Sequence, residues 1–180
     1  GSALGLVLTS PIWVLISAGI FFSSGGPVFY RQKRMGLDGQ LFEMLKFRTM
    51  HVGNVSDAPG WSHPGDPRRT QFGRWLRRFS FDEMPQLWNV LKGDMSLVGP
   101  RPEQASLIEE FRREVPGYML RHKVKSGMTG WAQVHGWRGD TSLHRRIEHD
   151  IYYIQNWSFG LDLEILLKTV SSVIRGRNAY

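Results

Sequence analysis

Residues 80–103 read SFDEMPQLWNVLKGDMSLVGPRPE and carry the strongest structural and chemical signals in the chain. Ser80, with Glu83 three residues later, has the pattern of a helix capping box. Apolar residues then follow at helical spacing as far as Gly93, and glycine commonly ends helices. The closing Gly-Pro-Arg-Pro segment predicts a rigid turn that presents Arg101 in a nearly fixed direction.

The adjacent carboxylates Asp82 and Glu83 fall at the expected N-terminus of this helix, where the backbone dipole stabilises anions. Five arginines lie between positions 68 and 78. Two acids beside so many cations indicate chemistry on a phosphate, with a divalent metal as the bridge. The alternative interpretation is a capped surface helix beside a solvated basic face.

Composition limits the class of protein. A chain of 180 residues is long enough for one domain with a core, and 41% hydrophobic residues with seven tryptophans argue against disorder. The net charge of +7 favours anionic partners, namely nucleic acid, a phospholipid surface or phosphorylated small molecules. The absence of cysteine excludes disulfides, cysteine-ligated zinc and a thiol nucleophile.

The N-terminal segment from Ala3 to Phe22 contains no charged residue. Twenty helical residues would extend about 30 Å, which matches a bilayer core. Pro11 interrupts the segment, and the hydroxyls of Thr9 and Ser10 can satisfy the carbonyls that a proline leaves unbonded. Three structures remain open from these residues: a straight membrane span, a bent re-entrant helix and a buried core helix.

The remaining periodicity predicts a hairpin and several helices. A strand beginning at Val28, a turn over 36–39 and a second strand over 41–47 form the hairpin, and its basic residues Arg31, Lys33 and Arg34 are expected at anionic headgroups. The expected helices cover residues 70–78, 104–114, 142–156 and 157–174, the last of them either packed or interfacial. Residues 51–67 are predicted to be a loop, and the separation of His51 and His63 matches no metal-ligand spacing.

The stretch resembles the signature of the bacterial sugar transferases, the monotopic phosphoglycosyl transferases that start surface-glycan assembly. It contains Asp-Glu, Pro-Gln-Leu, Leu-Lys-Gly-Asp-Met-Ser and Gly-Pro-Arg-Pro in order, and Gly-x-Thr-Gly-Trp-Ala-Gln-Val follows from Gly127 to Val134. The resemblance extends from Pro27 to Tyr180. It is greatest to the C-terminal catalytic domain of the larger undecaprenyl-phosphate glucose phosphotransferase members. We therefore expect a fragment of a longer protein, with Gly1 and Ser2 left from expression.

The resemblance implies an α+β fold, with a helix-rich catalytic domain over residues 26–180, a small antiparallel hairpin and interfacial amphipathic helices. It also implies that residues 1–25 form a re-entrant anchor broken at Ser10-Pro11. The protein would then be monotopic in the bacterial inner membrane, with the catalytic domain on the cytoplasmic face.

The reaction implied is transfer of a sugar 1-phosphate from a UDP-sugar to undecaprenyl phosphate with release of UMP, the first membrane step of exopolysaccharide, capsule or other surface glycan synthesis. Asp82 is the expected nucleophile, which forms a covalent phosphosugar intermediate, and Glu83 its metal-binding or acid-base partner. Both carboxylates are expected to bind Mg²⁺. Lys46, Arg77 and Arg101 are the expected phosphate contacts.

The segments at residues 137–141 and 175–180 most resemble members that use UDP-glucose, and UDP-galactose is the alternative donor. A different class, a non-catalytic module that binds anionic membrane, would explain the charge but leaves the two carboxylates without a role. Nucleic acid is not an expected partner, because no recognised binding motif is present. Membrane lipid is an expected partner, and a homodimer is left open.

Overall fold

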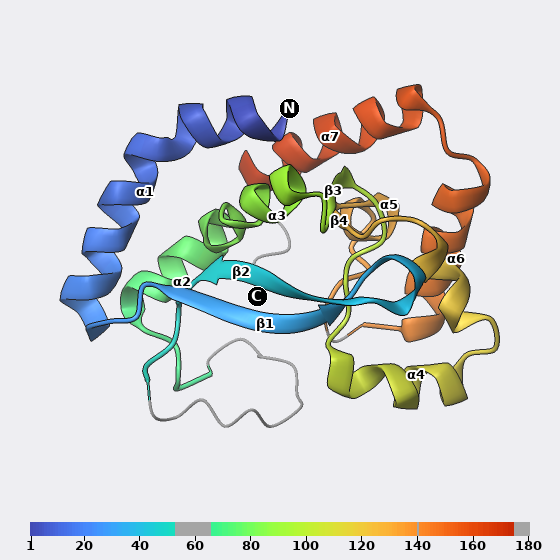
Figure 1. Ribbon diagram of the computed structural model, residues 1–180, viewed down its shortest axis with the longest axis horizontal. Helices are drawn as coiled ribbons and strands as arrows, with labels where there is room; N and C mark the ends of the chain where they lie inside the picture. Colours follow the sequence, from blue (N-terminus) through green and yellow to red (C-terminus); the bar gives the residue numbers. More distant parts are fainter. Residues whose placement is uncertain (53–65, 140, 175–180) are drawn as a thin grey trace.

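The computed structural model describes residues 1–52, 66–139 and 141–174. It confirms the predicted α+β class, with helices arranged around two separate two-stranded sheets (Figure 1). The elements, with η for 3₁₀-helix, are α1 (Ser2–Ser24), β1 (Phe29–Met35), η1 (Leu37–Gly39), β2 (Leu41–Phe47), α2 (Gln71–Arg78), η2 (Phe81–Glu83), α3 (Gln86–Lys92), β3 (Ser96–Val98), η3 (Ala105–Leu107), α4 (Ile108–Glu114), η4 (Tyr118–Lys123), β4 (Gly127–Thr129), α5 (Trp131–Val134), α6 (Leu143–Gln155) and α7 (Phe159–Ile174). Several sequence predictions lie outside the described residues: most of the loop predicted over 51–67, with His63 in it, Asp140, and the segment 175–180.

The predicted hairpin is confirmed. Strands β1 and β2 pair antiparallel, with Phe29 opposite Phe47 and Met35 opposite Leu41. Helix α3 is fastened to β2 because the Asn89 side chain accepts a hydrogen bond from the Leu45 amide and donates one to the Glu43 carbonyl. These hydrogen bonds hold α3, which follows Asp82 and Glu83, against β2, which carries Lys46.

Two sequence predictions are wrong in this part of the chain. Arg34 does not lie at the surface: it is 8% exposed, and its guanidinium donates to the Pro102 carbonyl at 3.0 Å. The helix expected from residue 104 begins as the 3₁₀-helix η3 and becomes α-helical only at Ile108.

The second sheet, a parallel pair of β3 and β4, was not predicted. Ser96 pairs with Gly127 and Val98 with Thr129, although the sequence around Gly127 reads as a glycine-rich loop. A Cβ added at Gly127 would lie 2.1 Å from the Gly99 nitrogen, so the two backbones approach more closely than any side chain allows. Such short strands leave little periodicity in the sequence.

Helix α1 is continuous but turns sharply partway along its length (Figure 1). Pro11 has no N–H, so the Val7 carbonyl four residues earlier has no helical partner. The Ser10 hydroxyl donates to that carbonyl at 2.8 Å, and the Thr9 hydroxyl donates to the Gly5 carbonyl at 2.7 Å. The predicted compensation by hydroxyls is confirmed.

One side of α1 packs on the rest of the protein. Ile16 and Ile20 are buried with Phe47 and Leu76, and the small residue Gly19 lets Phe72 of α2 approach. This contact fixes the second half of α1 on the domain.

The other side of α1 is exposed and apolar. Leu8, Leu15 and Phe22 are 67%, 72% and 86% exposed. Among the described helices, α1 alone is long and apolar enough to cross a membrane, and little of it is buried within the protein. This exposure argues against the buried core-helix alternative.

Candidate active site

The two carboxylates lie in η2, before the α-helix begins. The predicted capping box is wrong, since Ser80 adopts a left-handed conformation (φ 57°, ψ 21°) and its side chain makes no capping hydrogen bond. Pro85 precedes the first residue of α3 with φ −61°, a conformation that suits a helix start. The proline therefore places the start of α3 after Asp82 and Glu83, which share a separate 3₁₀ turn. The predicted helix end at Gly93 is confirmed, with φ 88°.

Glu83 is held by two cations. Lys46 Nζ lies 2.8 Å from Glu83 Oε1, and the Arg101 guanidinium donates to Oε1 at 2.5 Å and to Oε2 at 3.3 Å. The three side chains come from β2, from η2 and from the Gly-Pro-Arg-Pro turn after β3, and all are largely buried. Strand pairing and the turn thus bring together two charges that are 55 residues apart in the sequence.

Burial and charge set the ionisation of this cluster. Burial favours the protonated form of Glu83, but the charges of Arg101 and Lys46 outweigh it and hold the pKa of Glu83 well below its usual value. Burial lowers the pKa of Lys46 to about 8, although the charge of Glu83 opposes this shift. Glu83 is therefore a permanent anion at neutral pH, and Lys46 is a cation that deprotonates more easily than an ordinary lysine.

Asp82 is in a different state from its neighbour. It is 8% exposed, and within the described parts of the chain its carboxylate accepts no hydrogen bond. Burial and the negative charge of Glu83 raise the pKa of Asp82, against the opposing charges of Lys46 and Arg77. The expected position of Asp82 in the first turn of the helix is wrong, because Asp82 lies in η2 and α3 begins only at Gln86. Its oxygens remain available to an incoming ligand.

Arg77 and Arg138 also face this cluster. Arg77, on α2, donates from Nε to the Thr49 hydroxyl at 2.9 Å, and its charge acts on Asp82. Arg138 acts on both Asp82 and Glu83. The structure thus brings together all five site residues predicted from sequence, and it adds Arg138.

Sequence reasoning missed Arg138 as a site residue, although a local signal was present. It lies in a turn bounded by Gly136 and Gly139, which have φ of 87° and 69°. The turn that carries Arg101 is similar, because prolines flank that arginine as glycines bound the turn of Arg138.

The donor set suits a metal held jointly with a ligand rather than by the protein alone. Among the described residues, no group of three or more His, Cys, Asp or Glu side chains could hold an ion. The oxygens of Glu83 are already bonded to Lys46 and Arg101, whereas those of Asp82 are not. Mg²⁺ is often bound by one or two carboxylates together with waters and substrate phosphates, and Asp82 fits that mode.

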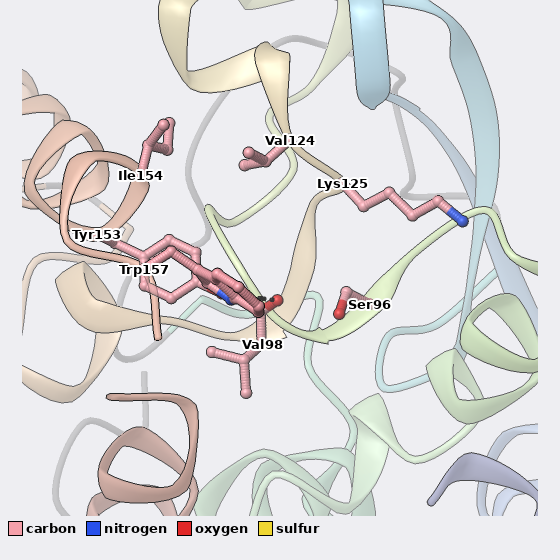
Figure 2. Close-up of a pocket in the computed structure, with 7 residues that line it drawn as sticks. All are labelled: Ser96, Val98, Val124, Lys125, Tyr153, Ile154 and Trp157. Carbon is pink, nitrogen blue, oxygen red and sulfur yellow. Dashed lines mark hydrogen bonds between the residues drawn. The ribbon is translucent and has the colours of Figure 1, made fainter. Parts of the chain in front are cut away.

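A cavity elsewhere does not include these residues. A cavity of about 230 Å³ lies between β3 and the end of α6. Figure 2 shows Lys125 pointing away from Tyr153 and Trp157. The residues that line it are Ser96, Val98, Val124, Lys125, Tyr153, Ile154 and Trp157. None of them belongs to the charged cluster around Asp82.

Large apolar side chains are exposed on several elements besides α1. They are Trp75 on α2, Trp88 and Leu91 on α3, and Leu163, Leu167 and Val170 on α7. Figure 1 shows the first part of α1 and helix α7 along the same edge of the molecule, with α3 close by. This is the distribution expected of a protein that contacts a membrane interface.

Comparison with known proteins gives a consistent result. A family model described as "Bacterial sugar transferase" matches residues 1–176. A Klebsiella pneumoniae protein named UDP-glucose:undecaprenyl-phosphate glucose-1-phosphate transferase is 46% identical over 99% of this chain and 39% of its own length. A Caulobacter vibrioides protein of the same name is 44% identical over 99% of this chain and 68% of its own length.

A relative with a different donor in its name is nearly as similar. The UDP-N-acetylgalactosamine-undecaprenyl-phosphate N-acetylgalactosaminephosphotransferase of Aeromonas hydrophila is 42% identical over 99% of this chain and 43% of its own length. The chain thus spans about two fifths of the length of the Klebsiella and Aeromonas relatives.

Proposed function

Because this chain belongs to the bacterial sugar transferase family, we propose that it is an enzyme that transfers a sugar 1-phosphate from a UDP-sugar to undecaprenyl phosphate. The observation that carries the proposal is the contrast between two adjacent carboxylates. Glu83 is bonded to Lys46 and Arg101, while Asp82 accepts no hydrogen bond from any described residue. A buried carboxylate with free oxygens among cations is suited to attack an anionic phosphorus centre.

In the first step, an Asp82 carboxylate oxygen forms a bond to the sugar-bearing phosphorus of the UDP-sugar. The bond from that phosphorus to the bridging oxygen breaks, and UMP leaves with the electron pair. In the second step, a phosphate oxygen of undecaprenyl phosphate attacks the same phosphorus and releases Asp82. The product is an undecaprenyl diphosphate sugar, and the carboxylate is regenerated.

Both steps bring two anions together, so electrostatic stabilisation by the surrounding cations is the main contribution to catalysis. Lys46 and Arg101 lie against Glu83, and Arg77 acts on Asp82 from α2. We assign these three side chains to the oxygens of the diphosphate. Because Glu83 fixes the positions of Lys46 and Arg101, its role in this scheme is to orient the two cations.

Mg²⁺ is the proposed cofactor, and Asp82 is the residue that would hold it together with the substrate diphosphate. When bound, the ion would neutralise charge on the phosphate oxygens. A nearby divalent charge would also favour the ionised form of Asp82, whose pKa is raised by burial. Glu83 would contribute to the ion only if it gave up a contact with Lys46 or Arg101.

The location of the second substrate explains the apolar surface. Undecaprenyl phosphate has its phosphate at the membrane interface and its tail in the bilayer. We propose that the bent helix α1 is a re-entrant anchor in the inner membrane that holds Asp82 at headgroup depth on the cytoplasmic face. The exposed side chains of α1, α3 and α7 would contact lipid.

UDP-glucose is the donor that we propose, with UDP-galactose or another UDP-sugar as alternatives. Two of the relatives described above carry UDP-glucose in their names and one carries UDP-N-acetylgalactosamine. The pathway proposed is exopolysaccharide or another surface glycan, in keeping with a Sinorhizobium fredii relative named exopolysaccharide production protein, 37% identical over 98% of this chain.

The test uses the 180-residue chain in lipid nanodiscs with undecaprenyl phosphate, Mg²⁺ and a panel of UDP-sugars. UMP release with one donor is expected, and an Asp82-containing peptide should gain the mass of that sugar phosphate when the acceptor is omitted. No UMP with any donor, while the chain still binds anionic vesicles, would instead favour the non-catalytic membrane-binding alternative.

A further inference from the structure

A second group of charges lies entirely inside the protein. Glu103, Arg121, Arg146 and Asp150 are each at most 2% exposed. Arg146 donates to Glu103 Oε1 at 2.6 Å, and Arg121 donates from Nε to Asp150 Oδ2 at 2.9 Å. Arg121 also forms ion pairs with Asp150 at 2.7 Å and with Glu103 at 3.5 Å. These four side chains are called the buried ion network below. None of them is among the residues assigned above to substrate or metal.

The buried ion network is bonded to the backbone of the turn that carries Arg101. Arg121 donates from its second terminal nitrogen to the Arg101 carbonyl at 2.8 Å. Arg34 donates to the next carbonyl in the turn, that of Pro102, at 3.0 Å. Two guanidinium groups, those of Arg121 and Arg34, thus hold the backbone of the turn that carries Arg101.

The same network is bonded to the turn that carries Arg138. Arg146 donates to the Gly139 carbonyl and also lies 3.4 Å from the Thr141 hydroxyl. Because Arg146 and Arg121 both contact Glu103, the two arginine-bearing turns are connected through a single carboxylate.

Stability alone is a poor explanation for such a group. Removing ions from water costs several kcal/mol each, and replacing a buried ion pair by apolar residues is often neutral or stabilising. A guanidinium with a fixed fork of donors does, however, hold several acceptors at set angles. Arg121 and Arg146 each hold a carboxylate and a turn carbonyl at the same time in this way.

We propose that Glu103, Arg121, Arg146 and Asp150 are positioning residues, which lock the two turns so that Arg101 and Arg138 present their charges to the diphosphate beside Asp82. The inference rests on the proposed function. It deepens that function by naming the residues that set the geometry of the cations. Misplacement of a charged group by about 1 Å can cost about 100-fold in rate, so the network acts on catalysis without touching substrate.

The test is a pair of double-mutant cycles on kcat/KM for UMP release. Arg146→Lys keeps the positive charge near Glu103 but removes the fork that reaches Gly139. It is expected to lower kcat/KM about 10- to 100-fold in the wild-type background. In the Arg138→Ala background, the same substitution is expected to change kcat/KM by less than about 2-fold, since the turn no longer presents a charge. Arg121→Lys, alone and with Arg101→Ala, forms the second cycle.

Arg145→Lys is the matched control, because Arg145 is the exposed neighbour of Arg146 on α6 and bonds to Glu148 at 3.1 Å. It should leave kcat/KM unchanged. Equal losses from Arg146→Lys in both backgrounds would overturn the inference, because general damage does not depend on Arg138. If Arg146→Lys does not fold, Thr141→Val tests the same turn by the same cycle.

Binding of UDP, measured by isothermal titration with Mg²⁺, gives a readout independent of turnover. The Arg146→Lys variant should bind UDP more weakly than wild type, and the Arg145→Lys variant should not. A wild-type chain that binds UDP but never releases UMP would refute the proposed function. An active wild-type chain with additive cycles would refute the positioning role alone.

Discussion

Helix α1 and the centre of the domain depart from the usual distribution of side chains in opposite ways. The helix exposes Leu15 and Phe22 at 72% and 86%, whereas the centre buries Glu103 and Arg121 at 2% and 1%. Neither arrangement is favourable in water for the protein by itself. Under the proposed function both departures have a role: the exposed side of α1 would contact lipid, and the buried charges would hold the turns whose arginines face the diphosphate.

The sharpest test of this comparison is Asp82→Asn, which removes the proposed nucleophile with little change of shape. Turnover should fall more than about 1000-fold, as for loss of a covalent nucleophile, while the binding of the chain to anionic vesicles stays the same. UMP release and vesicle co-sedimentation measure the two properties. Retained turnover would show that the centre works without an Asp82 adduct.

Arg101→Lys should have the next largest effect. Arg101 contacts both oxygens of Glu83 through two different nitrogens, and a lysine cannot reproduce this planar pairing. We expect kcat/KM to fall about 100-fold. Arg113→Lys, at an exposed arginine on α4 that pairs with Glu109, is the control and should behave as wild type.

The pH dependence of kcat/KM should show the state of Lys46. Its pKa is lowered to about 8, so its charge is present below that pH and is lost as the pH rises through it. Because kcat/KM reports the free enzyme, activity should decline about tenfold per unit above pH 8. Lys46→Arg should abolish this alkaline limb, and an unchanged limb would assign it to another group.

At acidic pH, activity should be lost as the pH falls, because Asp82 becomes protonated. Burial raises the pKa of Asp82, and the nucleophile must be ionised, so activity should be lost on acidification at a higher pH than for an ordinary aspartate. Added Mg²⁺ should move this acidic limb to lower pH if the ion is bound by Asp82. A limb that does not respond to Mg²⁺ would separate the ion from this carboxylate.

The smallest effects should distinguish the two sides of α1. Ile16 is 3% exposed and Leu15 is 72% exposed, so Ile16→Val should lower the free energy of unfolding by about 1 kcal/mol and Leu15→Val by less than about 0.5 kcal/mol. Thermal unfolding in detergent measures both. Equal losses would mean that both sides of α1 are packed within the protein.

Local patterns predicted much of this structure. The hairpin, helices α2 and α6, the bend at Pro11 and the helix end at Gly93 all depend on neighbours in sequence, through alternation, helical spacing and special backbone residues. The five predicted site residues lie near one another in the structure, and their roles stay predictions. Their selection relied on the family resemblance as well as on the pattern.

What sequence reasoning missed depends on contacts between distant residues. The pairing of β3 with β4 joins backbones about 30 residues apart, and only the close approach at Gly99 and Gly127 requires glycine there. The burial of Arg34 and Arg121 could not be predicted, because arginines in amphipathic segments are usually exposed. The start of α3 was misplaced because Ser80 and Glu83 fit a capping box that Pro85 displaces.

The hydroxyl of Ser10 has a consequence for the anchor role proposed for α1. The carbonyl that Pro11 would strand is already satisfied from within α1, so the elbow requires neither water nor lipid to maintain it. If α1 is the proposed re-entrant anchor, no unbonded carbonyl at the bend has to lose its water on entering hydrocarbon, a step that costs several kcal/mol.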